Sequence, residues 1–205
     1  MLSAFTKALL LITSAELGDK SFLITMFLAM RHPRRWVFLG TVLALAVMTV
    51  LSVLLGKILT VVSPEYMRYA ESGLFLFFGC KLLYRGWKMS AQNEGEELAE
   101  AEIEVEKADR QLGAKPTPLK MVVESFTLIF IAEWGDRTQF ATIALAAAND
   151  PVGVVIGAIL GHTICAVIAV VAGKSIAGRI SEKLVTLIGG GLFIVFGAIA
   201  LFEVK

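Results

Sequence analysis

The chain has 205 residues, of which 57% are hydrophobic, and its formal net charge is +1. Soluble domains have about 45 to 50% apolar residues, so the composition excludes an ordinary soluble protein, and the small net charge gives no indication of nucleic-acid binding. The composition instead predicts an all-α polytopic membrane protein.

Six hydrophobic segments follow one another along the chain, and each is a candidate transmembrane helix. We expect them at residues 5–30, 36–61, 66–86, 119–148, 151–173 and 183–203. The stretch between the third and fourth is polar and acidic and cannot span a bilayer. This predicts a first three-helix repeat at 1–88, an acidic cytoplasmic linker at 89–117, and a second three-helix repeat at 118–205. We expect the linker to be a solvated, partly helical connector.

The two halves are related by an internal duplication. A shift of 117 residues places Glu16 on Glu133 and Gly40 on Gly157. Shared hydrophobicity alone does not explain charges and glycines that match in register. Because each half has an odd number of spans, the second half enters the membrane in the opposite orientation. The chain is therefore predicted to form two inverted repeats, a construction typical of secondary transporters.

The distribution of Lys and Arg orients this arrangement. Most of these residues lie in the connections after the first, third and fifth segments. The positive-inside rule places such connections in the cytoplasm, so both chain termini are expected on the non-cytoplasmic side.

Charged residues lie in the middle of the first and fourth segments, where each costs about 2.5 to 3.5 kcal/mol at the bilayer centre. The two copies of the motif read ELGDKS at 16–21 and EWGDRT at 133–138. Positions i, i+3 and i+4 share a face of a continuous helix. The acidic and basic side chains of each copy are therefore predicted to project together, near the midplane.

The motifs supply an all-oxygen donor set, the kind that Ca²⁺, Mn²⁺ and Mg²⁺ prefer. The predicted metal ligands are Glu16, Asp19, Glu133, Asp136, Ser21 and Thr138. Five residues are expected to support them: Lys20 and Arg137 by holding the carboxylates of the empty site, Gly18 and Gly135 by allowing local unwinding, and Gln139 as an asymmetric ligand. The carboxylates can also take up protons, which offers a route to proton exchange.

Other interpretations stay open. The motifs could form structural ion pairs that clamp the first segment to the fourth, or serve a transporter of another solute such as an amino acid. Asp19 and Asp136 could also form the dyad of an intramembrane aspartyl hydrolase, although the other four motif charges would then have no role. His162 matches Leu45 in the first half and is either a packing residue or a proton relay.

At the two motifs the sequence resembles the calcium/manganese cation:proton antiporters, or Gdt-type transporters, which are defined by two E-x-G-D-[KR]-[TS] motifs. ELGDKS and EWGDRT match at every position, and the resemblance covers essentially the whole chain. It implies a transporter, not an enzyme, that exports Mn²⁺, and in many members Ca²⁺, in exchange for protons by alternating access. The resemblance implies a bacterial or cyanobacterial manganese exporter, located in a prokaryotic plasma or thylakoid membrane. Whether the protein forms a homo-oligomer stays open.

Overall fold

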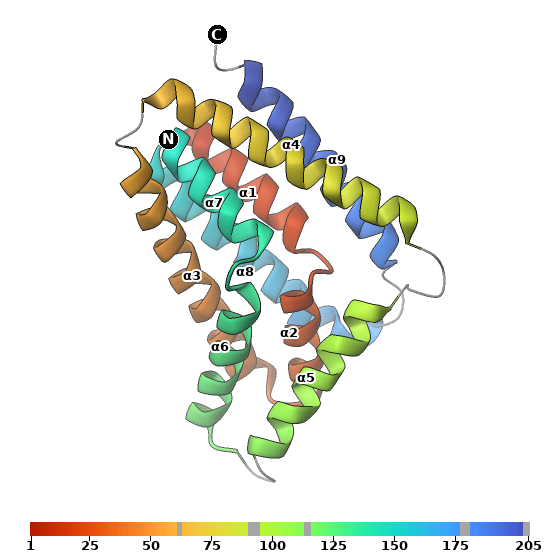
Figure 1. Ribbon diagram of the computed structural model, residues 1–205. Helices are drawn as coiled ribbons and strands as arrows, with labels where there is room; N and C mark the ends of the chain where they lie inside the picture. The colour runs from red at the N-terminus through yellow and green to blue at the C-terminus, as the bar shows by residue number, and fades with distance from the viewer. Residues whose placement is uncertain (61–62, 90–94, 113–115, 177–180, 203–205) are drawn as a thin grey trace.

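The computed structural model describes residues 1–60, 63–89, 95–112, 116–176 and 181–202, and all of its regular structure is helical (Figure 1). The helices are α1 (Leu2–Glu16), α2 (Lys20–Arg31), α3 (Arg34–Leu59), α4 (Pro64–Lys88), α5 (Glu96–Leu112), α6 (Pro118–Glu133), α7 (Arg137–Ala148), α8 (Pro151–Ile176) and α9 (Glu182–Phe202). The predicted all-helical class is confirmed.

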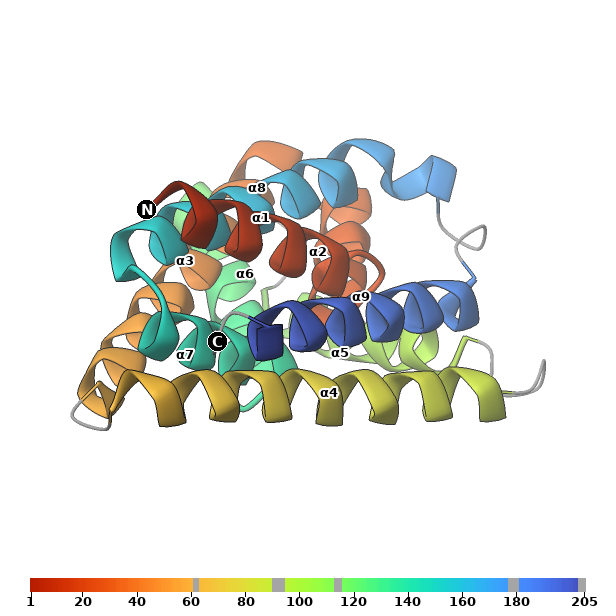
Figure 2. The same ribbon diagram turned by 90° about the horizontal axis from the view of Figure 1, so that it is seen from above.

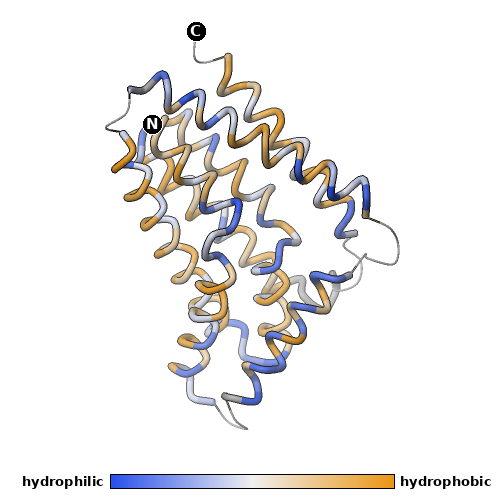
Figure 3. The backbone as a smooth tube through the Cα atoms, viewed as in Figure 1, coloured by the Kyte–Doolittle hydropathy of each residue, from blue (hydrophilic) through white to orange (hydrophobic). Residues whose placement is uncertain are grey.

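Within the described residues, three helices are long and apolar enough to cross a membrane: α3, the Pro151–Val171 part of α8, and α9. In Figure 3 apolar residues run along these helices, whereas hydrophilic residues gather on α5 and at helix ends. Together with α4, these helices match the predicted segments to within a few residues. The first and fourth predicted segments differ, because each consists of two helices joined by a short break.

The two breaks have the same backbone geometry. Each centres on a glycine with positive φ, 77° at Gly18 and 81° at Gly135, a conformation that other residues rarely adopt. The following aspartate is extended and occupies the N-cap position of the next helix, with ψ of 169° at Asp19 and 163° at Asp136. The predicted unwinding at the glycines is confirmed. The expectation that the motif charges share one helix face is wrong, because the break removes the continuous helix that it assumed.

Close glycine contacts show that α8 runs parallel to α1. A Cβ atom on Gly153 would lie 2.5 Å from the carbonyl oxygen of Met1, and one on Gly161 would lie 3.0 Å from the Thr13 hydroxyl. Glycines spaced four residues apart, Gly153, Gly157 and Gly161, therefore let the two helices pack closely.

The same kind of contact shows that α3 runs parallel to α6 and α7. A Cβ on Gly40 would lie 2.5 Å from the Val122 carbonyl of α6, and one on Gly56 would lie 2.5 Å from the Ile143 carbonyl of α7. Figure 1 shows that the broken helix α1–α2 and its counterpart α6–α7 run in opposite directions.

α4 and α9 lie side by side as a layer against the other helices (Figure 2). Gly79 faces Ile194 and Gly86 faces Leu187, so this pair is antiparallel. The third helix of each half therefore also runs opposite to its counterpart.

The acidic stretch contains α5, which packs along α2 and does not simply float in solvent. Its small apolar residues Ala101, Val105 and Ala108 are buried, and the first two join a core cluster with Phe22 and Phe27 of α2. The expectation of a solvated connector is wrong for this part. The rest of the predicted linker lies partly outside the described residues.

Charged side chains on α5 bind basic groups of the helical core. Asp109 contacts Arg31 at 2.8 Å and His32 at 2.6 Å, and Glu97 contacts Arg85 at 2.6 Å. α5 is therefore an amphipathic helix: its apolar residues pack against α2, and its acidic residues pair with basic side chains of other helices.

The parallel packing of α1 and α8 predicts the outcome of adding one methyl group. In Gly157→Ala the new Cβ would collide with the Phe5 carbonyl oxygen and lie 3.1 Å from the Ala8 Cβ, which we expect to cost about 1 to 3 kcal/mol. Gly73→Ala is the matched control, because nothing lies within 4 Å of its Cβ, and it should gain up to about 1 kcal/mol of helix propensity. Thermal unfolding in detergent measures both, and equal melting temperatures would contradict the close contact.

Candidate metal centre

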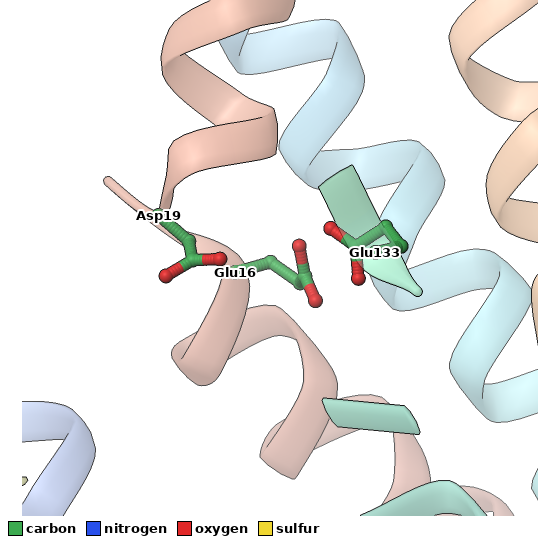
Figure 4. Close-up of side chains that lie close together, drawn as sticks. All are labelled: Glu16, Asp19 and Glu133. Carbon is green, nitrogen blue, oxygen red and sulfur yellow. The ribbon is translucent and has the colours of Figure 1, made fainter. Parts of the chain in front are cut away.

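Carboxylates from both copies of the motif meet where the two breaks face each other. One oxygen each from Glu16, Asp19 and Glu133 lies within 4.8 Å of the other two. The Glu16 side chain lies between the other two, and its carboxylate faces that of Glu133 (Figure 4). Glu16 and Glu133 are each only 2% exposed. Buried carboxylates at this spacing require a compensating cation, protons or hydrogen-bond donors.

A hydroxyl group of the same motif binds each of the two glutamates. Ser21 donates its Oγ proton to Glu16 Oε2 at 3.1 Å, and Thr138 donates its Oγ1 proton to Glu133 Oε2 at 3.2 Å. The first and last motif positions thus meet across the break in both copies. A hydroxyl oxygen keeps its lone pairs in such a bond, so it can also contribute to an oxygen ligand set.

The two motif aspartates have different surroundings. Asp19 belongs to the carboxylate group and forms an ion pair with Arg137 of the other repeat. Asp136 instead accepts a hydrogen bond from the backbone N–H of Thr138 at 3.2 Å, and so caps α7. Its Oδ2 also lies 3.1 Å from the Thr138 hydroxyl, whose single proton it shares with Glu133. Among the described residues the sequence duplication therefore does not produce a symmetric set of four carboxylates.

The two motif cations also differ. Lys20 points to α5, where it contacts Glu104 at 2.8 Å and Glu100 at 3.4 Å. Arg137 lies inside the protein, pairs with Asp19 and donates to the Ala15 carbonyl oxygen at 3.3 Å. The structure thus places only Arg137 against the carboxylates. Lys20 is instead held by the acidic side chains of α5, the helix that packs along α2.

Gln139 supports the second break with its side-chain oxygen. That oxygen accepts a hydrogen bond from the Gly135 N–H at 2.7 Å, and its amide nitrogen lies 3.0 Å from Met48 Sδ. The side-chain oxygen of Gln139 thus braces the break, and the role of Gln139 as an asymmetric ligand stays a prediction.

Buried hydroxyl groups that the sequence analysis did not select surround the carboxylates. Five of them are no more than 2% exposed: Thr25, Thr41, Thr49, Ser52 and Thr142. The hydroxyls of Thr25 and Thr41 lie 3.2 Å apart, and Thr142 donates to the Thr138 carbonyl at 2.8 Å. A signal was present, since the 117-residue shift places Thr25 on Thr142 within apolar segments.

His162 of α8 also reaches this group. Its Nδ1 lies 3.8 Å from Glu16 Oε1. Two cavities of about 10 Å³ each adjoin the imidazole, one also lined by Glu133 and Thr138, the other by Glu16 and Ser21. Such a volume accommodates about one water-sized body. The sequence match to Leu45 gave no sign that His162 would lie beside a motif carboxylate.

A much larger cavity of about 710 Å³ borders the second break. It is lined by Gly135, Asp136 and Arg137 of that break, and α4 contributes Lys81 and Arg85 to the opposite wall. The charged group is therefore close to an open space on the side of α4 and tightly enclosed on the side of α8.

Comparison with known proteins adds an independent finding. The family described as "Divalent cation/proton antiporter GDT1" matches residues 4–90 and 121–205, two stretches that flank most of the predicted linker. A GDT1-like protein of Synechocystis is 58% identical over 200 residues, covering 98% of this chain and 97% of the relative.

Plant relatives are similar over the same extent of this chain. The PAM71-homolog, chloroplastic, of Arabidopsis thaliana is 42% identical over 218 residues, which cover 98% of this chain and 60% of the relative. GDT1-like protein 3 of Oryza sativa is 41% identical over 210 residues, which cover 98% of this chain and 75% of the relative. No solved structure matches the chain.

The unequal surroundings of Lys20 and Arg137 predict unequal effects of neutralising them. Arg137→Gln leaves Asp19 buried beside two other carboxylates without its counter-charge, and we expect a loss of about 3 to 5 kcal/mol. Lys20→Gln, the same change at the equivalent position, removes a partly exposed pair and should cost about 0 to 1 kcal/mol. Unfolding of the two variants in detergent gives the comparison. Similar losses would mean that Arg137 does not neutralise the buried group.

Proposed function

The chain belongs to the GDT1 family of divalent cation/proton antiporters, and on this basis we propose that it exports Mn²⁺ from the cytoplasm in exchange for protons, with Ca²⁺ as a second substrate. It is a multi-pass membrane transporter and not an enzyme. The observation that carries the proposal is the group of Glu16, Asp19 and Glu133, two of them buried and one partly exposed, to which both repeats contribute.

We infer that these three carboxylates bind the cation directly. Ser21 and Thr138 are the supporting hydroxyls, since each already touches one of the glutamates. Three carboxylates against the single guanidinium of Arg137 leave net negative charge at the centre, which favours a divalent cation. All of these donors are oxygen atoms, which suits Mn²⁺ and Ca²⁺ and disfavours softer metals. Asp136 is proposed as an accessory carboxylate that joins when the second break moves.

Proton exchange follows from the same groups. A carboxylate must be deprotonated to bind a metal ion, so metal and protons compete for the site. Without the metal, carboxylates this close together and this deeply buried are stabilised by taking up protons. Occupation by one cargo therefore excludes the other, which is the requirement for an antiporter.

The arrangement of the helices supports alternating access. We propose six crossings, with α1–α2 and α6–α7 each forming one broken crossing and α3, α4, α8 and α9 forming the others. The first three-helix repeat is 1–88, the second is 118–205, and corresponding helices run in opposite directions about the carboxylate group. Transporters built from inverted repeats bind their cargo at broken helices between the repeats. Rocking of one repeat against the other would open the site to each side in turn.

The orientation in the membrane is proposed from charge. Connections rich in Lys and Arg mark the cytoplasmic side, which places α5 inside the cell and both chain termini outside the cytoplasm. A plasma or thylakoid membrane of a prokaryote is the proposed location. It is supported by the Synechocystis relative and by the relative whose name places it in the chloroplast.

Two alternative functions are less well supported. An aspartyl hydrolase needs two aspartates that share a proton, but Asp19 faces Arg137 whereas Asp136 caps α7. The cavity of about 710 Å³ beside the second break would hold an amino acid. Glu16 and Glu133, however, line cavities of only about 10 Å³ each, which suit an ion better than an amino acid.

Neutralising either glutamate tests the proposal. Glu16→Gln and Glu133→Gln keep the size of the side chain but remove a charge that the cation needs. We therefore expect Mn²⁺ flux into proteoliposomes under a pH gradient to fall to the protein-free background. Glu124→Gln is the control, because Glu124 lies on α6 nine residues before Glu133, about 13 Å along the helix, and its flux should stay near that of the wild type.

A well-folded Glu133→Gln protein with wild-type flux would eliminate the three-carboxylate site. Size-exclusion profiles of the same preparations show whether each variant is folded, so a loss of flux is not confused with a loss of protein.

A further inference from the structure

His162 is the one imidazole that the described structure places beside the carboxylates, and its Nδ1 is left without a partner. The residue is 6% exposed, and its Nδ1 has no hydrogen-bond partner among the described residues. Glu16 Oε1, 3.8 Å away, is also buried and also unpartnered. That distance is too long for a hydrogen bond. Two unsatisfied polar atoms that face each other in a protein interior indicate that a third body belongs between them.

The position of His162 breaks the two-fold pattern of the site. The duplication supplies paired carboxylates and paired hydroxyls, but it places Leu45 at the position equivalent to His162. Leu45 lines the same two small cavities as the imidazole. The second repeat therefore supplies a nitrogen donor, His162, where the first repeat supplies the aliphatic side chain of Leu45.

Close packing of α8 against α1 brings the histidine to the glutamate. A Cβ on Gly161, the preceding residue, would lie 3.2 Å from the Leu9 carbonyl oxygen and 3.0 Å from the Thr13 hydroxyl. Only glycine allows the two backbones to approach this closely at that turn. The imidazole is thus held one turn from the end of α1, where Glu16 lies.

We propose that His162 is a nitrogen ligand of the transported cation and that it biases the site toward Mn²⁺ over Ca²⁺. This inference rests on the proposed function and names a residue that sets its ion preference. With an ion bound, Nδ1 of His162 and Oε1 of Glu16 are neighbouring ligands, and each gains the partner that it lacks in the protein alone.

The spacing suits two ligands of one ion. Metal–ligand distances of about 2.0 to 2.6 Å place neighbouring donor atoms about 3 Å apart and opposite ones more than 4 Å apart. The 3.8 Å between Nδ1 and Oε1 lies between these limits. Little movement is therefore needed for both atoms to contact a cation that also contacts Glu133 or Asp19.

The chemistry of the donor explains the preference. Ca²⁺ takes oxygen ligands almost entirely. Mn²⁺ also favours oxygen, but as a first-row transition ion it binds imidazole more readily than Ca²⁺ does. Carboxylates and hydroxyls alone would bind both ions. One imidazole among them adds a bond that Mn²⁺ can use and Ca²⁺ cannot, so the histidine raises the affinity for one ion without greatly changing that for the other.

Pulsed electron paramagnetic resonance of purified, tag-free protein loaded with Mn²⁺ tests the proposal directly. The chain has two histidines, so an imidazole ¹⁴N coupling to the bound Mn²⁺ comes from His162 or from His32. We expect the coupling in the wild type and in His32→Gln, the matched control, whose histidine binds Asp109 on α5. We expect none in His162→Gln or His162→Leu, the latter being the residue at the equivalent position.

Competition between the two ions gives the second readout. In His162→Gln the affinity for Mn²⁺ should fall at least about ten-fold, as is usual when a metal site loses a group, and the affinity for Ca²⁺ should change less than about two-fold. Wild-type protein that binds Mn²⁺ without nitrogen coupling would overturn this inference and leave the proposed function standing. Wild-type protein that binds neither ion would overturn both. The wild-type spectrum shows whether a nitrogen atom binds the Mn²⁺, so the test stands even if a His162 variant does not fold.

Discussion

The clustering of three carboxylates in an apolar helical bundle, with Glu16 and Glu133 buried and Asp19 partly exposed, is the constraint on which the rest of the structure depends. Charges of one sign at this spacing are tolerated only when protons, a cation or polar partners compensate them. The positive-φ glycines Gly18 and Gly135 supply part of the compensation, because they end one helix and start another at the same depth. The N-termini of α2 and α7, which begin at the two breaks, favour negative charge nearby. The guanidinium of Arg137, from the other repeat, neutralises Asp19.

Divergence between the repeats gives the site its direction and its chemistry. The two motifs place an acid, a glycine, a second acid, a cation and a hydroxyl at equivalent positions, yet Asp19 joins the carboxylate group whereas Asp136 caps α7. Lys20 forms an ion pair with Glu104 of α5, whereas its counterpart Arg137 forms an ion pair with Asp19 of the carboxylate group. A site built from two copies can thus bind a single ion, with one side open toward a large cavity and the other enclosed by α8.

The sequence predicted what depends on local pattern. Uninterrupted apolar runs located α3, α8 and α9, and the two glycines located the breaks. The side-chain directions beyond each break could not be predicted, because the i, i+4 rule assumes a continuous helix. Neither could the contact of His162 with Glu16, which joins residues far apart in the chain. The acids of α5 look like a solvated charge run in the sequence, because their partners Lys20 and Arg31 lie on another helix that is distant in the chain.

The most direct test of the central claim is whether Mn²⁺ movement alone moves protons. Wild-type protein is reconstituted in vesicles with equal pH on both sides and a pH-sensitive dye inside, and Mn²⁺ is then added outside. If metal and protons compete for the same carboxylates, Mn²⁺ entry drives protons out and the vesicle interior becomes alkaline, whereas vesicles with Asp19→Asn show no change. Mn²⁺ entry at constant internal pH, or an interior that turns acidic, would contradict the account.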